Sequence, residues 1–179
     1  SKTISILNES GVDLNPLSKF RLGVVGQSTT NLFVAALPAA AARFGVNLTV
    51  IEAEYDQVVQ SALDASSTIL SNELDAILIC FDYRELPFDA GIEIVFDLIN
   101  KVRDGFARHT QTPMIFQTLS CPPAPVFGSF DCMDNSSLRS LIARVNSHLL
   151  QLAQANNDYI LDIDAVASSV GTQLWHNPA

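Results

Sequence analysis

Positive charge is scarce in this sequence, and its shortage excludes one class of partner. The 179 residues include 10 Lys and Arg against 19 Asp and Glu, which gives a formal net charge of −9 at pH 7. The few basic residues are scattered along the chain, so they form no cluster of the kind that contacts a phosphate backbone. We therefore expect no nucleic-acid partner.

Cysteine and histidine are also few, with three of each. Cys80, Cys121 and Cys132 form no Cys-x-x-Cys pair and no group of histidines accompanies them, so a metal site is not expected. Cys80 lies in an apolar run, where a cysteine typically serves as a small buried hydrophobic side chain. Cys121 and Cys132 flank one loop and are expected to be free thiols, because a cytosolic setting keeps cysteines reduced.

Long hydrophobic runs are missing too, although 48% of the residues are hydrophobic and only 16% are charged. No apolar run reaches the roughly 18 residues of a membrane span, and no basic segment precedes an apolar leader, so a cytoplasmic location is the default expectation. A composition this apolar predicts that part of the surface meets another domain or subunit. We expect residues 174–179 to form no helix and the chain to be a piece of a longer polypeptide.

The predicted fold is organised around residues 21–31. The apolar run Leu22–Val25 is typical of a strand buried on both faces, and Gly26 allows a tight turn after it. A helix is predicted next, so Ser28 stands where an open α/β sheet places a nucleophile or an anion contact. Any of the residues 28–31 could cap that helix, so a second interpretation stays open, in which Ser28 or Thr29 is simply its N-cap.

Five apolar segments alternate with helical patterns along the chain. Because each parallel crossover returns right-handed over the sheet, this alternation predicts a doubly wound α/β fold, a three-layer sandwich around a five-stranded parallel sheet. We expect an N-terminal arm at residues 1–20 and a single domain at residues 21–179. The expected strands cover 22–25, 47–53, 76–81, 113–119 and 159–163, and the expected helices cover 32–44, 57–70, 90–107 and 136–155.

Two segments carry further expectations. The helix at 32–44 is apolar on almost every face and should be heavily buried, while Pro38 inside it predicts a kink or a break. Residues 120–135 form a long loop rich in Pro, Gly and Ser, and loops of this length in compact domains are usually functional or disordered.

Polar residues follow the predicted strands at their carboxyl ends, which meet at one edge of a parallel sheet. A nucleophilic serine needs a base within hydrogen-bond reach and donors for the developing oxyanion, and a serine, a histidine and backbone amides would supply them. The alternative is that Arg84 pairs with Glu85 or Asp82 at the surface and that His176 is solvated. The residues expected to converge are Ser28, Tyr55–Gln57, Asp82, Arg84, the 120–135 loop and His176.

Other motifs are excluded by their context. The segment from Gly23 to Gly26 is not the glycine-rich dinucleotide fingerprint, and no Lys-Ser or Lys-Thr pair follows the strand as in a phosphate loop, so no nucleotide cofactor is expected. Asp162 and Asp164 imitate the acidic strand end of aspartate-nucleophile phosphatases. That strand comes first in its sheet, whereas little chain follows here, and an ordinary last strand with acidic residues at its end is expected.

Short motifs spread over nearly the whole chain carry a resemblance to known families. They are residues 20–31, Glu54–Gln57, 66–70, 81–86, Asn146, Leu161-Asp162, Gly171 and Trp175. With the order of elements, the Gly26–Ser28 turn resembles the SGNH (GDSL-like) hydrolase superfamily, whose first block places a catalytic serine directly after strand one. The motifs are similar, more closely, to the amino-terminal domain of FkbH-like proteins.

The resemblance implies a flavodoxin-like or SGNH-like fold, followed in a longer protein by a haloacid-dehalogenase-like domain. FkbH-like proteins are associated with making glyceryl or related acyl thioesters on acyl carrier proteins. The resemblance thus implies transfer or thioester and ester chemistry on a small acyl substrate, with a carrier protein as partner and no cofactor. On this pattern Ser28 and His176 are catalytic. The oxyanion or substrate-binding residues are Gln27, Tyr55, Gln57, Asp82 and Arg84.

Two positions depart from the SGNH pattern. Asp82 stands near the place of an oxyanion-hole asparagine, and Gln173 stands three residues before His176, where the final Asp-x-x-His block carries its aspartate. A second hypothesis is therefore a catalytically degenerate SGNH fold that docks a carrier protein or a neighbouring domain, for which the apolar surface is the clue.

Overall fold

The computed structural model describes residues 10, 17–28 and 30–176, so most of the predicted N-terminal arm lies outside the described residues. The first strand begins at Ser18, before the apolar run that predicted it. The strands are β1 (Ser18–Gly26), β2 (Val46–Glu52), β3 (Ala76–Cys80), β4 (Met114–Gln117) and β5 (Tyr159–Leu161). The helices are α2 (Asn31–Ala42), α3 (Val58–Leu63), α4 (Ile92–Ala107), α5 (Leu138–Asn156), α6 (Ile163–Val170) and α7 (Thr172–Trp175), with short 3-10 turns η1 (Phe88–Ala90) and η2 (Gly128–Cys132).

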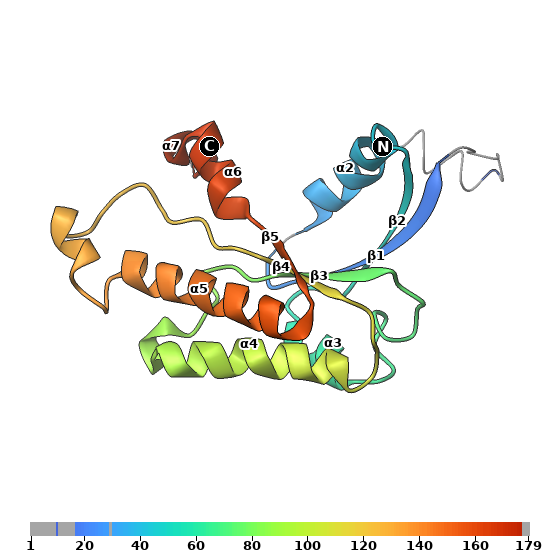
Figure 1. The fold of residues 1–179 in the computed structure, drawn as a ribbon, viewed down its shortest axis with the longest axis horizontal. Helices are drawn as coiled ribbons and strands as arrows, with labels where there is room; N and C mark the ends of the chain where they lie inside the picture. The colour runs from blue at the N-terminus through green and yellow to red at the C-terminus, as the bar shows by residue number, and fades with distance from the viewer. Residues whose placement is uncertain (1–9, 11–16, 29, 177–179) are drawn as a thin grey trace.

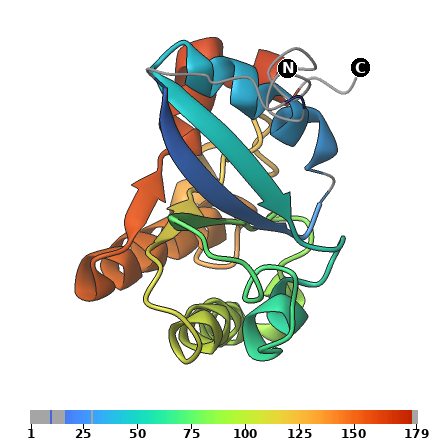
Figure 2. The ribbon, with the colours of Figure 1, turned by 90° about the vertical axis from the view of Figure 1, so that its right-hand side faces the viewer.

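The five strands form one parallel sheet in the order β2-β1-β3-β4-β5. Helices α3, α4 and α5 cover one face, and α2, α6 and α7 lie over the other (Figure 1, Figure 2). This arrangement confirms the predicted α/β three-layer sandwich. β2 and β3 flank β1 on opposite sides, so the strand order reverses at β1. The crevice at the carboxyl ends of β1 and β3 is therefore the position where such folds bind ligands.

The two faces of the sheet are covered unequally. The face toward α4 and α5 carries the larger core, with the fully buried side chains Phe81, Ile99, Phe106, Phe116 and Leu149. The opposite face carries a smaller buried cluster, formed by Leu22, Val24, Leu48, Ala76, Leu78 and Cys80. Cys80 is thus a buried hydrophobic side chain as predicted, and burial raises the pKa of its thiol to about 12.

The predicted heavy burial of the helix at 32–44 is wrong. No residue of α2 is buried, and Leu32 is 88% exposed. Of the α2 side chains, Val34, Leu37 and Ala41 pack against the smaller cluster, and Leu32 and Phe33 are exposed. The helix also runs unbroken through Pro38, where it lacks one backbone hydrogen bond because proline has no N–H.

The helix predicted at 57–70 is shorter than expected, since α3 ends at Leu63. Asp64 leaves the helical region with φ −94° and ψ 109°. Its carboxylate accepts hydrogen bonds from the backbone N–H and the hydroxyl of Ser66, at 2.8 and 2.7 Å. Local bonds of this kind compete with helix formation, and the apolar spacing that predicted the helix does not reveal them.

The end of the described chain is more helical than predicted. Leu174 and Trp175, expected outside any helix, belong to α7. Asp162 stands at the N-terminus of α6, where its carboxylate accepts a hydrogen bond from the N–H of Ala165 at 3.1 Å. Asp162 therefore follows the last strand of the described sheet, as predicted, and caps the helix after it.

Gly105 lies where α4 packs on α3, and no room is left there for a side chain. A Cβ atom on Gly105 would lie 2.9 Å from the carbonyl oxygen of Ala62. Alanine is favoured over glycine inside a helix by about 1 kcal/mol, but overpacking against backbone costs about 1–3 kcal/mol. We expect Gly105→Ala to lower the free energy of unfolding by about 1 kcal/mol in urea denaturation. A gain in stability would contradict this close contact.

Candidate active site

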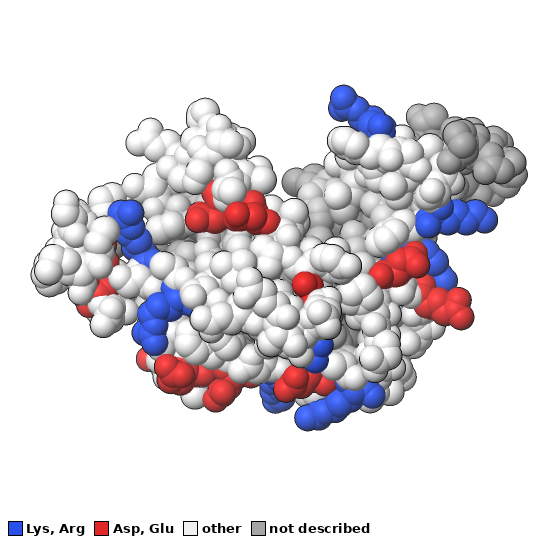
Figure 3. All heavy atoms as spheres, in the orientation of Figure 1, with Lys and Arg blue, Asp and Glu red and all other residues white. Residues whose placement is uncertain are grey.

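A cavity of about 900 Å³ opens at the carboxyl ends of the strands, between α2 and α7. Figure 3 shows the surface hollowed between these two parts of the molecule. Apolar side chains from several elements form much of its wall, among them Phe33, Leu37, Leu78, Leu161 and Trp175. Its polar residues include Ser28, Asp82, Arg84, Ser120 and His176. Apolar walls with a few convergent polar groups are the usual make-up of a small-molecule site.

Four of the single residues that the sequence predicted for the site lie together in this cavity: Ser28, Asp82, Arg84 and His176. The predicted 120–135 loop lines it as well, through Ser120, Pro122 and Pro123. Gln27 lines a neighbouring depression of about 430 Å³ together with Gln57. Tyr55 lines neither space, and its side chain is 67% exposed.

The sheet order explains why the loop after β2 stands apart. β2 is the edge strand beside β1, so the 54–57 loop at its carboxyl end is the loop farthest from β4 and β5. Gln57 instead donates a hydrogen bond from its side-chain amide to Glu54 at 3.0 Å within the same loop. The cavity forms on the other side of β1, over β3, β4 and β5.

Ser28 is not the N-cap of the helix that follows it. That position belongs to Thr30, whose hydroxyl donates a hydrogen bond to the carboxylate of Glu52 on β2. Thr29, the other residue considered for the cap, lies outside the described residues. Within the part of the chain that the structure describes, the Ser28 hydroxyl forms no hydrogen bond. It is therefore free to meet a bound molecule.

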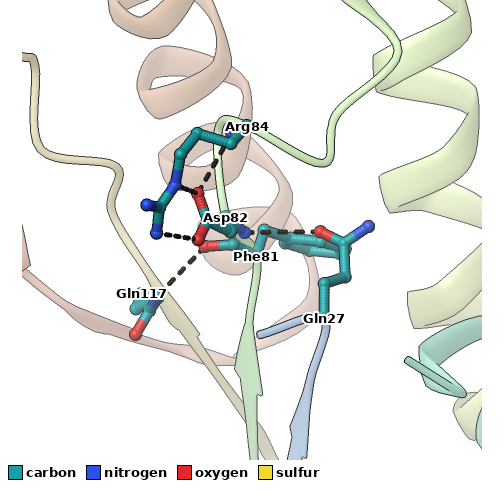
Figure 4. Close-up of polar contacts among 5 residues, drawn as sticks. All are labelled: Gln27, Phe81, Asp82, Arg84 and Gln117. Atoms are coloured by element: carbon teal, nitrogen blue, oxygen red, sulfur yellow. Dashed lines mark hydrogen bonds and ion pairs between the residues drawn. The ribbon is translucent and has the colours of Figure 1, made fainter. Parts of the chain in front are cut away.

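Asp82 and Arg84 form an ion pair at the cavity, as one of the two predicted alternatives had it (Figure 4). Arg84 Nη2 lies 2.6 Å from Asp82 Oδ2, and Arg84 Nε donates to Asp82 Oδ1 at 3.0 Å. Burial of the Asp82 carboxyl opposes its ionisation, but the hydrogen bonds and charge of Arg84 outweigh this, so the pKa of Asp82 lies below its ordinary value. Asp82 is an acceptor at neutral pH, so it does not itself donate to an oxyanion, whereas the neighbouring Arg84 guanidinium carries N–H donors.

The side chains of two glutamines tie the strand ends around this pair (Figure 4). The side-chain oxygen of Gln27, after β1, accepts a hydrogen bond from the backbone N–H of Asp82 at 3.3 Å. Gln117, at the end of β4, donates from its side-chain amide to the carbonyl of Phe81 at 3.0 Å. Gln27 thus acts at the site through Asp82, by holding the end of β3 beside the end of β1.

His176 makes its ring hydrogen bond with a serine that the sequence did not single out. Its Nε2 lies 2.9 Å from the Oγ of Ser120, the third residue after β4. Tyr83 packs edge-on against the ring, with centroids 6.4 Å apart. The signal that would have found Ser120 is its place near the end of a parallel strand, where the other site residues also stand.

Two classes of site find no support among the described residues. No group of three or more His, Cys, Asp or Glu side chains stands ready to hold a metal ion over residues 17–28 and 30–176. Over the same ranges, none of the helices has the length and apolar character needed to cross a bilayer.

The fold and the cavity define a doubly wound α/β domain with a ligand cavity at the switch point of its sheet. The chain belongs to the family of FkbH N-terminal domains, because the model of the family "FkbH, N-terminal domain" matches residues 21–179. This confirms the FkbH part of the resemblance seen in the sequence. A search of curated proteins found no match.

Two solved structures are similar to this chain. One is the N-terminal part of a Bacteroides fragilis protein, containing a phosphatase domain and complexed with Mg, with a TM-score of 0.75 and 20% identity over 94% of this chain. This chain spans 47% of that one. The other is a Bacteroides fragilis protein proposed to be an acylhydrolase, with a TM-score of 0.48 and 19% identity, covering 88% of this chain and 75% of that one. The first likeness supports the fold alone.

Proposed function

We propose that this domain carries out serine-dependent acyl chemistry, either acyl transfer or cleavage of a thioester or ester. The observation that carries the proposal is that Ser28, with a free hydroxyl, and His176 line one cavity of about 900 Å³. A hydroxyl needs a base to become a nucleophile at neutral pH, and an imidazole is the commonest base for this purpose. The cavity is large enough for a small acyl group with part of its carrier.

In the proposed reaction Ser28 attacks the acyl carbonyl carbon and His176 takes the hydroxyl proton. The oxyanion needs donors aimed at it, and the backbone N–H of Ser28 is the first candidate. The predicted contribution of Tyr55 and Gln57 is not retained, because both lie outside the cavity. Arg84 takes their place in the proposal, since it lines the cavity and carries N–H groups beyond those that bind Asp82.

The proposed acyl donor is a glyceryl-type or related acyl thioester on an acyl carrier protein. Support comes from membership of the FkbH N-terminal domain family and from the resemblance that implies this substrate class. A haloacid-dehalogenase-like domain in the same polypeptide is part of the proposal. It is supported by the similar structure that contains a phosphatase domain. This chain covers only 47% of the length of that chain.

Histidine substitution tests the proposed base. With a short-chain acyl thioester of an acyl carrier protein as substrate, we expect His176→Ala to slow loss of the acyl group at least about a hundredfold, the usual contribution of a general base. His109→Ala is the matched control, because His109 is exposed and does not line the cavity. Intact-mass measurement of the carrier protein follows the reaction. Equal rates in the two variants would refute the role of His176.

A docking module remains the second candidate, and one observation favours it. Large apolar side chains are exposed on α2 and its end and on the loop before α5: Leu32, Phe44, Val126, Phe127, Phe130 and Met133. A docking domain would bind a carrier protein whether or not that protein carries an acyl group, and it would turn over no thioester. Turnover by the wild-type chain therefore separates the two candidates.

A further inference from the structure

Ser120 joins the cavity edge of the sheet to His176. Ser120 is only 7% exposed, and its Oγ lies 2.9 Å from Nε2 of His176. Both residues line the cavity. The two residues are 56 positions apart in the sequence. The bond between them connects the carboxyl end of β4 with the end of α7.

The backbone just before Ser120 is held in place by hydrogen bonds to two neighbouring elements. The N–H of Leu119 donates to Oδ1 of Asn146 on α5 at 2.7 Å, and Nδ2 of Asn146 donates to the carbonyl of Leu119 at 2.9 Å. The hydroxyl of Thr118 donates to Asp162 at 3.0 Å. Fixed backbone of this kind holds a functional hydroxyl within the narrow tolerance that catalysis requires.

His176 depends on Ser120 for the orientation of its ring. Its backbone N–H donates to the carbonyl of Thr172 at 3.1 Å, and Tyr83 contacts the ring only through its edge. Within the described part of the chain, Ser120 is the hydrogen-bond partner of the ring. In a neutral imidazole one ring nitrogen carries a proton and the other does not. The hydrogen bonds that the ring makes decide which nitrogen is protonated.

We propose that Ser120 is a positioning residue, which accepts a hydrogen bond from Nε2–H of His176 and so leaves Nδ1 as the basic nitrogen. The proposal rests on the proposed acyl chemistry of the cavity. As the oxygen of Ser28 bonds to the acyl carbon, the hydroxyl proton moves to Nδ1. The imidazolium then gives that proton to the departing thiol or alcohol, and the neutral ring returns with its proton still on Nε2.

Reaction with a fluorophosphonate probe tests this role, because the probe adds to an activated serine hydroxyl. We expect labelling of Ser28 in the wild-type chain, a rate at least about tenfold lower in Ser120→Ala, and a rate near that of wild type in Ser120→Thr, which keeps the hydroxyl. The pH profile of labelling should change in Ser120→Ala. Ser129→Ala is the control, because Ser129 is exposed in the following loop and lies outside the cavity.

A second readout does not depend on activity. Nuclear magnetic resonance of the 15N-labelled chain should show an Nε2–H proton of His176 that exchanges slowly with water, and this signal should be absent in Ser120→Ala. Equal labelling rates and pH profiles in wild type and Ser120→Ala would overturn the positioning role and leave the acyl chemistry standing. An adduct on Ser120 itself would also overturn the positioning role. If no wild-type serine is labelled, the acyl chemistry fails, and a missing Nε2–H signal overturns the positioning role independently.

Discussion

Ser28→Ala should abolish turnover of a small acyl thioester, with a loss of at least about a thousandfold, because the attacking atom is gone. The stability should change little. Ser28 is only partly buried, and its hydroxyl has no hydrogen bond to lose within the described residues. We expect a change in Tm of no more than a few degrees, measured beside the rate on the same preparation.

Ser168→Ala is the control for this substitution, because it removes an exposed hydroxyl from α6 at a position that does not line the cavity. It should leave both the rate and the Tm unchanged. Turnover in Ser28→Ala equal to that of wild type would show that Ser28 is not the nucleophile. A large fall in Tm would instead mean that the loss of activity reports unfolding.

Asp158→Ala should produce the largest loss of stability. Asp158 directly precedes β5 and joins it to two other elements. Its carboxylate accepts hydrogen bonds from Arg103 Nε on α4 at 3.1 Å and from the backbone N–H of Met114 on β4 at 3.0 Å. Its side chain is 4% exposed and that of Arg103 is 17% exposed. Removing the Asp158 carboxylate leaves a partly buried cation and a buried N–H without these partners. We therefore expect the free energy of unfolding to fall by about 3 kcal/mol, and the Tm to fall by about 10 °C.

The pair between Glu93 and Arg144 supplies the matched control. Its atoms are 3.5 Å apart and the Glu93 side chain is 79% exposed, so Glu93→Ala should cost less than about 1 kcal/mol. The double variant Asp158→Ala with Arg103→Leu should recover part of the loss, because it removes the stranded cation as well. A cost for Asp158→Ala no greater than that for Glu93→Ala would contradict the structural role of the buried pair.

The sheet was predictable from the sequence because its signal is local. The runs at Leu22–Val25 and 76–81 are apolar throughout, as strands covered on both faces must be, and the structure has β1 and β3 at the centre of the sheet. The strict alternation with helices then left a parallel sheet as the expected architecture. That prediction needed no knowledge of any contact between distant residues.

The remaining features depend on contacts that a single sequence does not reveal. The apolar residues of α2 indicated burial, but only the three-dimensional arrangement shows that Leu32 is exposed. The 54–57 loop was placed at the site because it follows a strand, whereas the strand order puts β2 at the edge. The 120–135 loop was placed at the site, but Ser120 was not singled out within it, because its partner His176 is 56 positions away and the bond between them requires both α7 and the end of β4.

Mapping a covalent adduct tests the central claim, that this cavity holds an activated serine, most directly. The wild-type chain would be treated with a fluorophosphonate probe, digested with trypsin and examined by mass spectrometry. The account predicts a single adduct in the peptide Leu22–Arg43, at Ser28. No adduct, or an adduct confined to a serine outside the cavity, would contradict it.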